Sequence, residues 1–274
     1  MPPLNKLTHL RAFNFGEFTN GVPQQPLPPS IIPSAAQISA FFDLCYTLCL
    51  KLHRLLGAGL AVDPPSFFET AHLRSRGPSG NTLRFLRYPP RAAVVPGPPV
   101  DDDVRAGAHS DYGSLTLLFR LRGQAGLEVR TRAGAWALVP VVPPGAERDP
   151  APPILVNIGD LLSYWTNGLL RSTVHRVVFP GGGGGGGANA SPTVPGETAA
   201  EPRYSIAFFG HPVGTCALTP VPSERVAQHA APIAEGSKGN PYVERKVLTA
   251  DEHLQMRLRA SYLQLYPDDG EAKA

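Results

Sequence analysis

The residue types best suited to chemistry lie in two short segments of the chain. His109 and Asp111 stand two residues apart, directly before the apolar run 113–119, and His175 lies in the middle of the segment 172–178. Both segments have the composition of strands, and residues i and i+2 of a strand point to the same face. Two imidazoles and one carboxylate on one face can hold a ferrous ion and leave three coordination positions open. We therefore predict a metal site at His109, Asp111 and His175.

The spacing of His109, Asp111 and His175 alone is also compatible with residues that bind no metal. The chain has eight histidines and 22 acidic residues, so a His-x-Asp pair followed by a distant histidine arises readily by chance. In that case the three side chains are surface or core groups near a turn. The run Asp101–Asp103 is similarly interpreted as a solvated loop, and His53 as a packing or solvated residue of a helix.

The surrounding sequence favours the metal site. It contains, in this order, "AHSDYGSLTLLF", "ILVNIGDLLSYWTNGLLRSTVHRVVFP" and "RYSIAFFGHP". These motifs resemble the Fe(II)- and 2-oxoglutarate-dependent dioxygenase superfamily, in particular its isopenicillin-N-synthase-like branch with flavonol-synthase and gibberellin-oxidase type members. The resemblance is strong over residues 82–212. It implies hydroxylation or desaturation of a small organic molecule, with Fe(II), O2 and 2-oxoglutarate as cofactors, ascorbate as a reductant, and release of succinate and CO2.

The resemblance also implies residues that bind 2-oxoglutarate. In the family an Arg and a Ser two residues apart hold the distal carboxylate of the co-substrate, and Arg203 and Ser205 match this pattern. A guanidinium grips a carboxylate through two hydrogen bonds, and a hydroxyl adds another. Tyr88 resembles a family tyrosine that bonds the co-substrate, although Leu86 stands where the family often has Asn. The alternative for Tyr88 is an ordinary strand aromatic before a proline.

Several other residues of these motifs have two interpretations. Aromatic side chains can line the substrate pocket or belong to the core, and four are candidates: Tyr112, Phe119, Trp165 and Phe209. Asn157, Gly159 and Asp160 are expected to form a turn rather than to react. His211 is left out of the metal site, because a fourth ligand would block an open position.

The fold is predicted to be mainly β with flanking helices. Short apolar segments separated by Gly- and Pro-containing turns are typical of a sandwich or barrel. The resemblance specifies the double-stranded β-helix, a cupin-like jelly roll, with the ligands at one open end. The predicted strands are 82–88, 114–119, 127–130, 135–139, 154–158, 161–165, 172–178 and 203–209.

Two regions are expected along the chain. Residues 1–80 form a helical and loop region that is shortened relative to the family, and residues 81–274 form the dioxygenase domain. Helices are predicted at 34–57, with a capping box at Ser34 and Gln37, at 67–72, and from a second capping box at Thr249 and Glu252 to about residue 266, with an apolar face that includes Leu254 and Leu258. Residues 181–201 begin with seven glycines and are predicted to be a disordered insertion. A phosphate-binding glycine loop is the alternative, but the Lys-Ser/Thr pair is missing.

Composition bears on partners and location. The net charge of +3 and the scattered basic residues indicate no nucleic-acid or anionic-membrane partner. The three cysteines, Cys45, Cys49 and Cys216, and the absence of a secretory pattern at the N-terminus favour a cytoplasmic location without disulfides. We expect a monomer that acts on a small-molecule substrate. The shortened N-terminal region leaves one alternative function, a catalytically inactive relative that binds metal or a partner without turnover.

Overall fold

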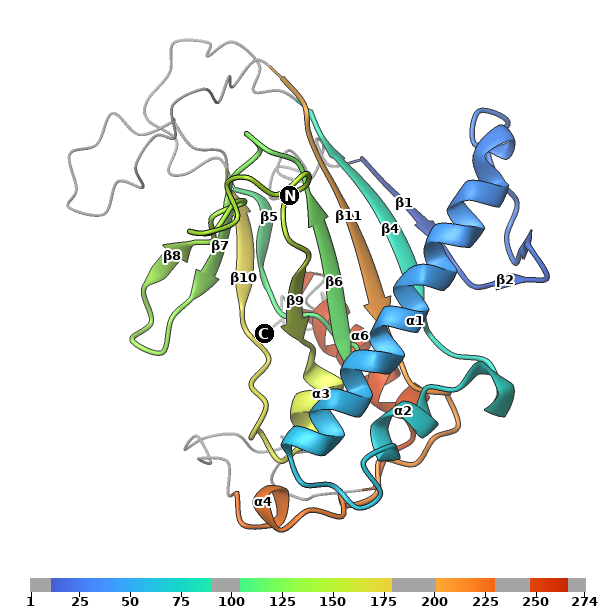
Figure 1. Ribbon diagram of the computed structural model, residues 1–274, viewed down its shortest axis with the longest axis vertical. Helices are drawn as coiled ribbons and strands as arrows, with labels where there is room; N and C mark the ends of the chain where they lie inside the picture. The colour runs from blue at the N-terminus through green and yellow to red at the C-terminus, as the bar shows by residue number, and fades with distance from the viewer. Residues whose placement is uncertain (1–10, 90–103, 179–200, 230–246, 266–274) are drawn as a thin grey trace, which may run out of the picture.

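The computed structural model describes residues 11–89, 104–178, 201–229 and 247–265, and two antiparallel sheets face each other within it (Figure 1). The five-stranded sheet has the order β1-β4-β11-β6-β9, and the four-stranded sheet has the order β5-β10-β7-β8. This is the predicted double-stranded β-helix. Its strands are β1 (Arg11–Phe15), β4 (Thr82–Tyr88), β5 (Val104–His109), β6 (Leu115–Arg120), β7 (Leu127–Arg130), β8 (Trp136–Leu138), β9 (Leu155–Ile158), β10 (His175–Val178) and β11 (Arg203–Gly210); β2 (Phe18–Thr19) and β3 (Val22–Pro23) form a separate pair.

The five-stranded sheet divides its side chains between two environments. Alternate residues of a strand point to opposite faces. Leu83, Leu117 and Phe208 point to the outer face and join a core cluster, whereas Arg84, Leu118 and Ala207 point inward and line a cavity between the sheets. Alternate residues of β11, and most of those on the same face of β4 and β6, are thus available to a ligand.

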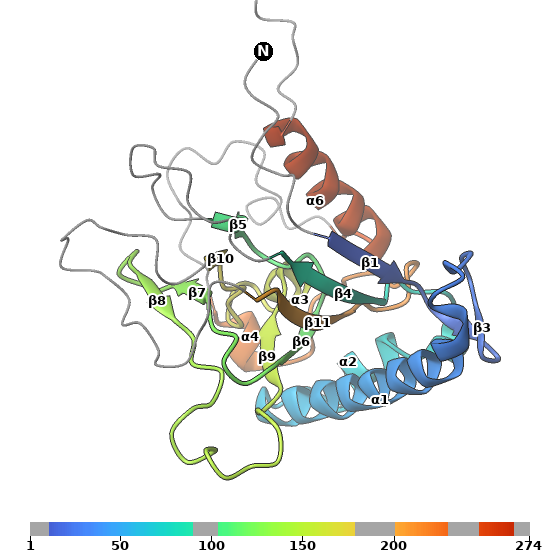
Figure 2. The ribbon, with the colours of Figure 1, turned by 90° about the horizontal axis from the view of Figure 1, so that it is seen from above.

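The long helix α1 (Ala35–Gly59) covers the outer face of this sheet (Figure 2). Its buried side chains recur at steps of three and four residues, which places them on one stripe; they include Ile38, Phe42, Cys45, Cys49 and His53. The predicted capping box is wrong, because Ser34 makes no side-chain capping bond and a 3-10 turn, η2 (Ile32–Ser34), precedes the helix. By length and composition alone the stretch 32–59 could cross a membrane, a test that the core helix of a soluble protein also passes.

Two predictions elsewhere in the chain are also wrong. The segment 161–165, predicted to be a strand, belongs to the helix α3 (Asp160–Trp165), with all six side chains buried. The C-terminal helix α6 (Ala250–Leu265) begins at the predicted box, in which Thr249 N donates to Glu252 Oε2 at 2.7 Å. The expected apolar face is wrong at Leu258, which is 44% exposed; Ala250 and His253 are buried instead.

The remaining elements are short. They are α2 (Phe67–Ala71), as predicted at 67–72, η3 (Arg74–Arg76) and α4 (Glu224–Ala227). Cys45 and Cys49 are free and buried, as expected of small core residues. The acidic run Asp101–Asp103 and nearly all of the Gly-rich segment 181–201 lie outside the described residues.

Buried histidines are a further feature of the core. The rings of His53 and His72 stack with centroids 3.8 Å apart, and His53 and His253 are fully buried. Burial lowers the pKa of His53 and of His253 to about 4, from an ordinary value of 6.5. Within the described part of the chain, neither ring nitrogen of His253 has a hydrogen-bond partner. These side chains are therefore neutral in the folded protein, and protonating them opposes folding.

We expect the free energy of unfolding to fall as the pH falls from about 6.5 to about 4. In that window the unfolded chain binds more protons than the folded chain, so each such histidine costs about 1.4 kcal/mol of stability per pH unit. The change His253→Leu should make this slope shallower. Urea titrations at pH 7.5, 6 and 5 measure the slope, with His229→Leu, in the partly exposed segment after α4, as the control. Equal slopes for His253→Leu and the parent protein contradict this account.

Candidate metal centre and co-substrate pocket

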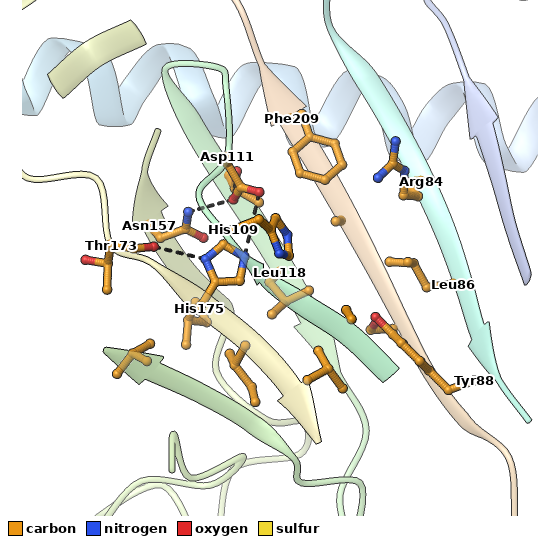
Figure 3. A pocket seen from close by; sticks show the side chains of 18 of the residues that line it. Arg84, Leu86, Tyr88, His109, Asp111, Leu118, Asn157, Thr173, His175 and Phe209 are labelled. Atoms are coloured by element: carbon orange, nitrogen blue, oxygen red, sulfur yellow. Dashed lines mark hydrogen bonds and ion pairs between the residues drawn. The ribbon is translucent and has the colours of Figure 1, made fainter. Parts of the chain in front are cut away.

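The three predicted metal ligands converge at one end of the cavity between the sheets (Figure 3). His109 ends β5, and His175 begins β10 and pairs directly with it across the antiparallel ladder. Asp111 lies in the loop between β5 and β6, so the expectation that His109 and Asp111 share one strand face is wrong, but the loop still brings the carboxylate to the two histidines. One ligand atom from each of the three side chains lies within 4.8 Å of the others.

The backbone fixes how the two imidazoles face the site. His109 Nδ1 lies 2.7 Å from the carbonyl oxygen of Gly107, and His175 Nδ1 lies 3.0 Å from that of Thr173. A carbonyl only accepts, so each Nδ1 carries the proton and each Nε2 keeps its lone pair for a metal. Burial, followed by the neighbouring His175, lowers the pKa of His109, which favours the neutral form that binds metal.

The two oxygens of the Asp111 carboxylate have different surroundings. Its Oδ2 accepts hydrogen bonds from Thr116 Oγ1 at 2.7 Å and from Asn157 Nδ2 at 2.8 Å. Its Oδ1 faces the histidines and lies 3.8 Å from His175 Nε2. The structure thus offers one carboxylate oxygen and two imidazole nitrogens, a donor set that fits Fe(II).

Two glycines let the backbone around Asp111 close tightly. A Cβ atom on Gly159 would lie 2.1 Å from the carbonyl oxygen of Gly113, and one on Gly113 would lie 2.5 Å from that of Gly210. This contact allows Asp160 N to donate to the Asp111 carbonyl at 2.7 Å. The motif "NIGD" therefore supports the ligand loop, and Asn157 does more than form a turn because its side chain holds the carboxylate.

We expect Thr116→Val to weaken Fe(II) binding by about 10- to 100-fold, the usual effect of losing an outer hydrogen bond to a metal ligand. Valine keeps the volume of this buried residue but leaves Asp111 Oδ2 with one donor fewer. Competition with a chelator measures the affinity, and Thr116→Ser, which keeps the hydroxyl, is the control. Unchanged affinity in Thr116→Val would mean that the carboxylate orientation does not depend on this bond.

The inner face of the sheet carries side chains in four rows, defined by strand register. The row nearest the ligands joins Phe209, Thr116 and Asn157, and the next joins Arg84, Ala207 and Leu118. The third row contains Leu86, Ser205 and Arg120, and the fourth contains Tyr88 and Arg203. The cavity has a volume of about 880 Å³, with its open mouth included.

The predicted co-substrate residues therefore meet at the end of the cavity remote from the metal ligands. Arg203 is 4% exposed, its Nε donates to the Ala125 carbonyl at 2.9 Å, and its guanidinium lies 5.0 Å from the centre of the Tyr88 ring. Ser205 is on the same face and is also buried. Burial raises the pKa of the Tyr88 hydroxyl, with Arg203 opposing the shift, so Tyr88 stays protonated and can donate. A buried guanidinium beside Tyr88, with the Ser205 hydroxyl on the same sheet face, suits a carboxylate.

Arg120 is a buried arginine that the sequence motifs do not predict to lie near this site. It is 7% exposed, stands opposite Ser205 in the register, and donates from Nη1 to the Val139 carbonyl at 3.1 Å. Burial, followed by the positive charge of Arg203, lowers its pKa. Alternation along β6 could have placed it on the inner face, but only the pairing of β6 with β11 shows that it lies beside the co-substrate end.

Of the four candidate pocket aromatics, only Phe209 lines the cavity. Phe119 packs edge-on against Phe41 of α1, and Trp165 is buried against Phe67 and Phe68. Tyr112 lies near the guanidinium of Arg257 rather than in the cavity. His211 is buried and does not line the cavity either, in agreement with its exclusion from the ligand set.

Comparison with known proteins agrees with this geometry. The 2-oxoglutarate-dependent dioxygenase htyE of Aspergillus rugulosus is 33% identical over 177 residues, which cover 63% of this chain and 46% of that protein. The proline hydroxylase buaE of Petromyces alliaceus is 35% identical over 176 residues, which cover 63% of this chain and 47% of that protein. The chain spans about half the length of the curated relatives that it matches.

Solved structures and a family model extend the comparison. A full-length Neurospora crassa protein, crystallised in complex with alpha-KG, superposes with a TM-score of 0.63 at 28% identity, covering 92% of this chain and 66% of that one. The sequence model of the 2OG-Fe(II) oxygenase superfamily matches residues 80–212, which contain all six predicted site residues. Through this domain the chain belongs to the 2OG-Fe(II) oxygenase superfamily.

Proposed function

We propose that this chain is an Fe(II)- and 2-oxoglutarate-dependent oxygenase that hydroxylates or desaturates a small organic molecule, with release of succinate and CO2. The observation that carries the proposal is the convergence of three ligand atoms within 4.8 Å, with both Nε2 lone pairs and Asp111 Oδ1 left for the metal. When bound there, iron would supply the activation of O2 for which side chains have no chemistry.

The protein's own residues do the positioning. His109, Asp111 and His175 would hold the iron and would leave coordination positions for the co-substrate, O2 and substrate. Arg203, Ser205 and Tyr88 would hold the distal carboxylate of 2-oxoglutarate at the far end of the cavity. The apolar inner side chains between these ends, Leu118, Leu127 and Val177, exclude water and so strengthen both sets of charged contacts.

Anaerobic addition of Fe(II) and then 2-oxoglutarate to the purified protein tests this assignment. We expect a visible metal-to-ligand charge-transfer band in the parent protein and none in His109→Ala. Succinate formation under air then tests turnover. No band from the folded parent protein would favour the alternative, an inactive relative.

We propose further that the protein belongs to the isopenicillin-N-synthase-like branch, acts as a cytoplasmic monomer in secondary metabolism, uses ascorbate as a reductant, and has no nucleic-acid or membrane partner. The motifs quoted above support the branch. The small net charge of +3, without a basic run, supports the absence of a polyanionic partner. Size-exclusion chromatography with light scattering tests the monomer.

A further inference from the structure

The cavity contains a second arginine that the proposed function does not use. Arg84 lines it from β4 and stands opposite Ala207, whereas Arg203 stands four residues away on β11, opposite Tyr88. Four residues of a strand span about 13 Å. One ligand end cannot occupy both guanidinium groups at that separation unless the side chains turn toward each other, and Arg203 is held by the Ala125 carbonyl.

A hydrogen bond to a neutral side chain holds Arg84 in place, and its positive charge stays uncompensated. Its Nε donates to Asn14 Oδ1 on β1 at 2.7 Å, and its guanidinium carbon lies 5.2 Å from the centre of the Phe209 ring. Among the described residues no carboxylate forms an ion pair with Arg84. Figure 3 places Phe209 between Arg84 and the Asp111 carboxylate, with Arg84 beside the cavity. The Asn14 bond orients the guanidinium and leaves its two terminal nitrogens for a ligand.

The charges around the cavity favour an anion at this position. Its lining residues, in the part of the chain that the structure describes, include two arginines, Arg84 and Arg203, but only one carboxylate, Asp111. Fe(II) and the 2-oxoglutarate dianion together add no net charge, so their binding supplies no counter-ion for Arg84. The buried Arg120, on the inner face of the same sheet, adds a further positive charge. A positive charge partly removed from water is most stable with a counter-ion.

We propose that Arg84 binds a carboxylate of the substrate, and that the substrates are therefore small carboxylic acids. The inference rests on the proposed function. A planar carboxylate matches the two free nitrogens of the guanidinium, and the apolar body of the acid would pack on Phe209. The strand β4 is two strand spacings from β6, roughly 10 Å, and β6 carries the Thr116 that supports Asp111. The reacting carbon is then a few bonds away from the carboxylate rather than adjacent to it.

Matched acids and amides test the proposal by binding alone. Phenylacetate, 3-phenylpropionate, hexanoate and their primary amides are titrated by calorimetry into the anaerobic Fe(II)–2-oxoglutarate complex. We expect at least one acid to bind the parent protein on the order of 10- to 100-fold more tightly than its amide. Arg84→Gln should remove this preference while the affinity for 2-oxoglutarate changes less than twofold.

Arg87→Gln is the matched control, because Arg87 is on the same strand but on the opposite face and does not line the cavity. It should retain the preference for acids. Asn14→Ala should reduce the preference in part, since it frees the Arg84 side chain. Arg84→Lys keeps the charge but loses the planar guanidinium that can bind a carboxylate through two nitrogens. Its preference for acids over amides should lie between those of the parent protein and Arg84→Gln.

Three results overturn the proposal. They are equal binding of every acid and its amide to the parent protein, an undiminished preference in Arg84→Gln, and a loss of 2-oxoglutarate affinity in Arg84→Gln as large as the loss of acid affinity. The last would assign Arg84 to the co-substrate. If the parent protein forms no Fe(II)–2-oxoglutarate complex, the proposed function fails instead. The acids are then titrated into the metal-free protein, where the same difference between the parent protein and Arg84→Gln is expected.

Discussion

Replacing Asp111 by alanine should abolish iron-dependent formation of succinate from 2-oxoglutarate. Among the described residues, the change removes the only carboxylate that lines the cavity, and it leaves Thr116 Oγ1 and Asn157 Nδ2 without their acceptor. Loss of a single outer hydrogen bond costs about 10- to 100-fold in metal affinity, and loss of the ligand itself should exceed that. The measurement is succinate production with Fe(II) at a saturating concentration for the parent protein.

The matched control is Asp149→Ala, which removes an exposed aspartate in the loop after β8. This variant should produce succinate at the level of the parent protein, and a chelator should abolish succinate production in both. His175→Ala should resemble Asp111→Ala, because the three ligand atoms form one cluster. Full activity and tight iron binding in His175→Ala would show that the metal is held elsewhere.

The convergence of His109, Asp111 and His175 could be predicted from the sequence, because residue type and motif order sufficed. The local geometry was wrong, since Asp111 lies between β5 and β6 and not on the strand of His109. The tautomers could not be read from the sequence. They follow from the backbone carbonyl groups of Gly107 and Thr173, which accept the Nδ1 protons. The orientation of these carbonyl groups depends on the backbone conformation near the end of β5 and the start of β10.

The residues that were missed act through pairing between strands. Asn157 stands opposite Thr116 in the register of β9 and β6, and Arg84 stands opposite Ala207 in that of β4 and β11. Neither pairing can be predicted from the sequence of one strand, because register depends on how two strands that are distant in the sequence pair with each other. Alternation within "LVNI" or "LRFLRY" gives the two faces of a strand but not which face meets the cavity.

The helix α3 shows where periodicity fails. The run 161–165 is short and apolar, and such a run fits a buried strand and a buried helical turn equally well. Backbone contacts decide between them: Asp160 N donates to the Asp111 carbonyl and Leu161 N to the Gly113 carbonyl, so the chain turns at Gly159 instead of pairing with a strand. The misassigned segment is thus the one that braces the ligand loop.

Replacing Arg203 by alanine should weaken 2-oxoglutarate binding far more than it weakens iron binding. The guanidinium is 4% exposed and lies beside Ser205 and the Tyr88 ring, so a carboxylate bound there is removed from water. Loss of such a charge-assisted pair costs on the order of 2 to 5 kcal/mol, which corresponds to about 30- to 5,000-fold in the dissociation constant. Anaerobic titration of the charge-transfer band with 2-oxoglutarate measures it, and chelator competition measures iron affinity separately.

Two further variants separate charge from geometry at Arg203. Arg203→Lys keeps the positive charge but loses the fork and the Nε bond to the Ala125 carbonyl, so its affinity for 2-oxoglutarate should lie between those of the parent protein and Arg203→Ala. Ser205→Ala should cost less, because it removes one hydrogen bond, about 1.5 to 3 kcal/mol when the acceptor is charged. If Arg203→Ala binds 2-oxoglutarate like the parent protein while Arg84→Gln does not, the two arginines have exchanged roles. The co-substrate would then lie along the rows of Arg84 and Ala207 instead of reaching Tyr88.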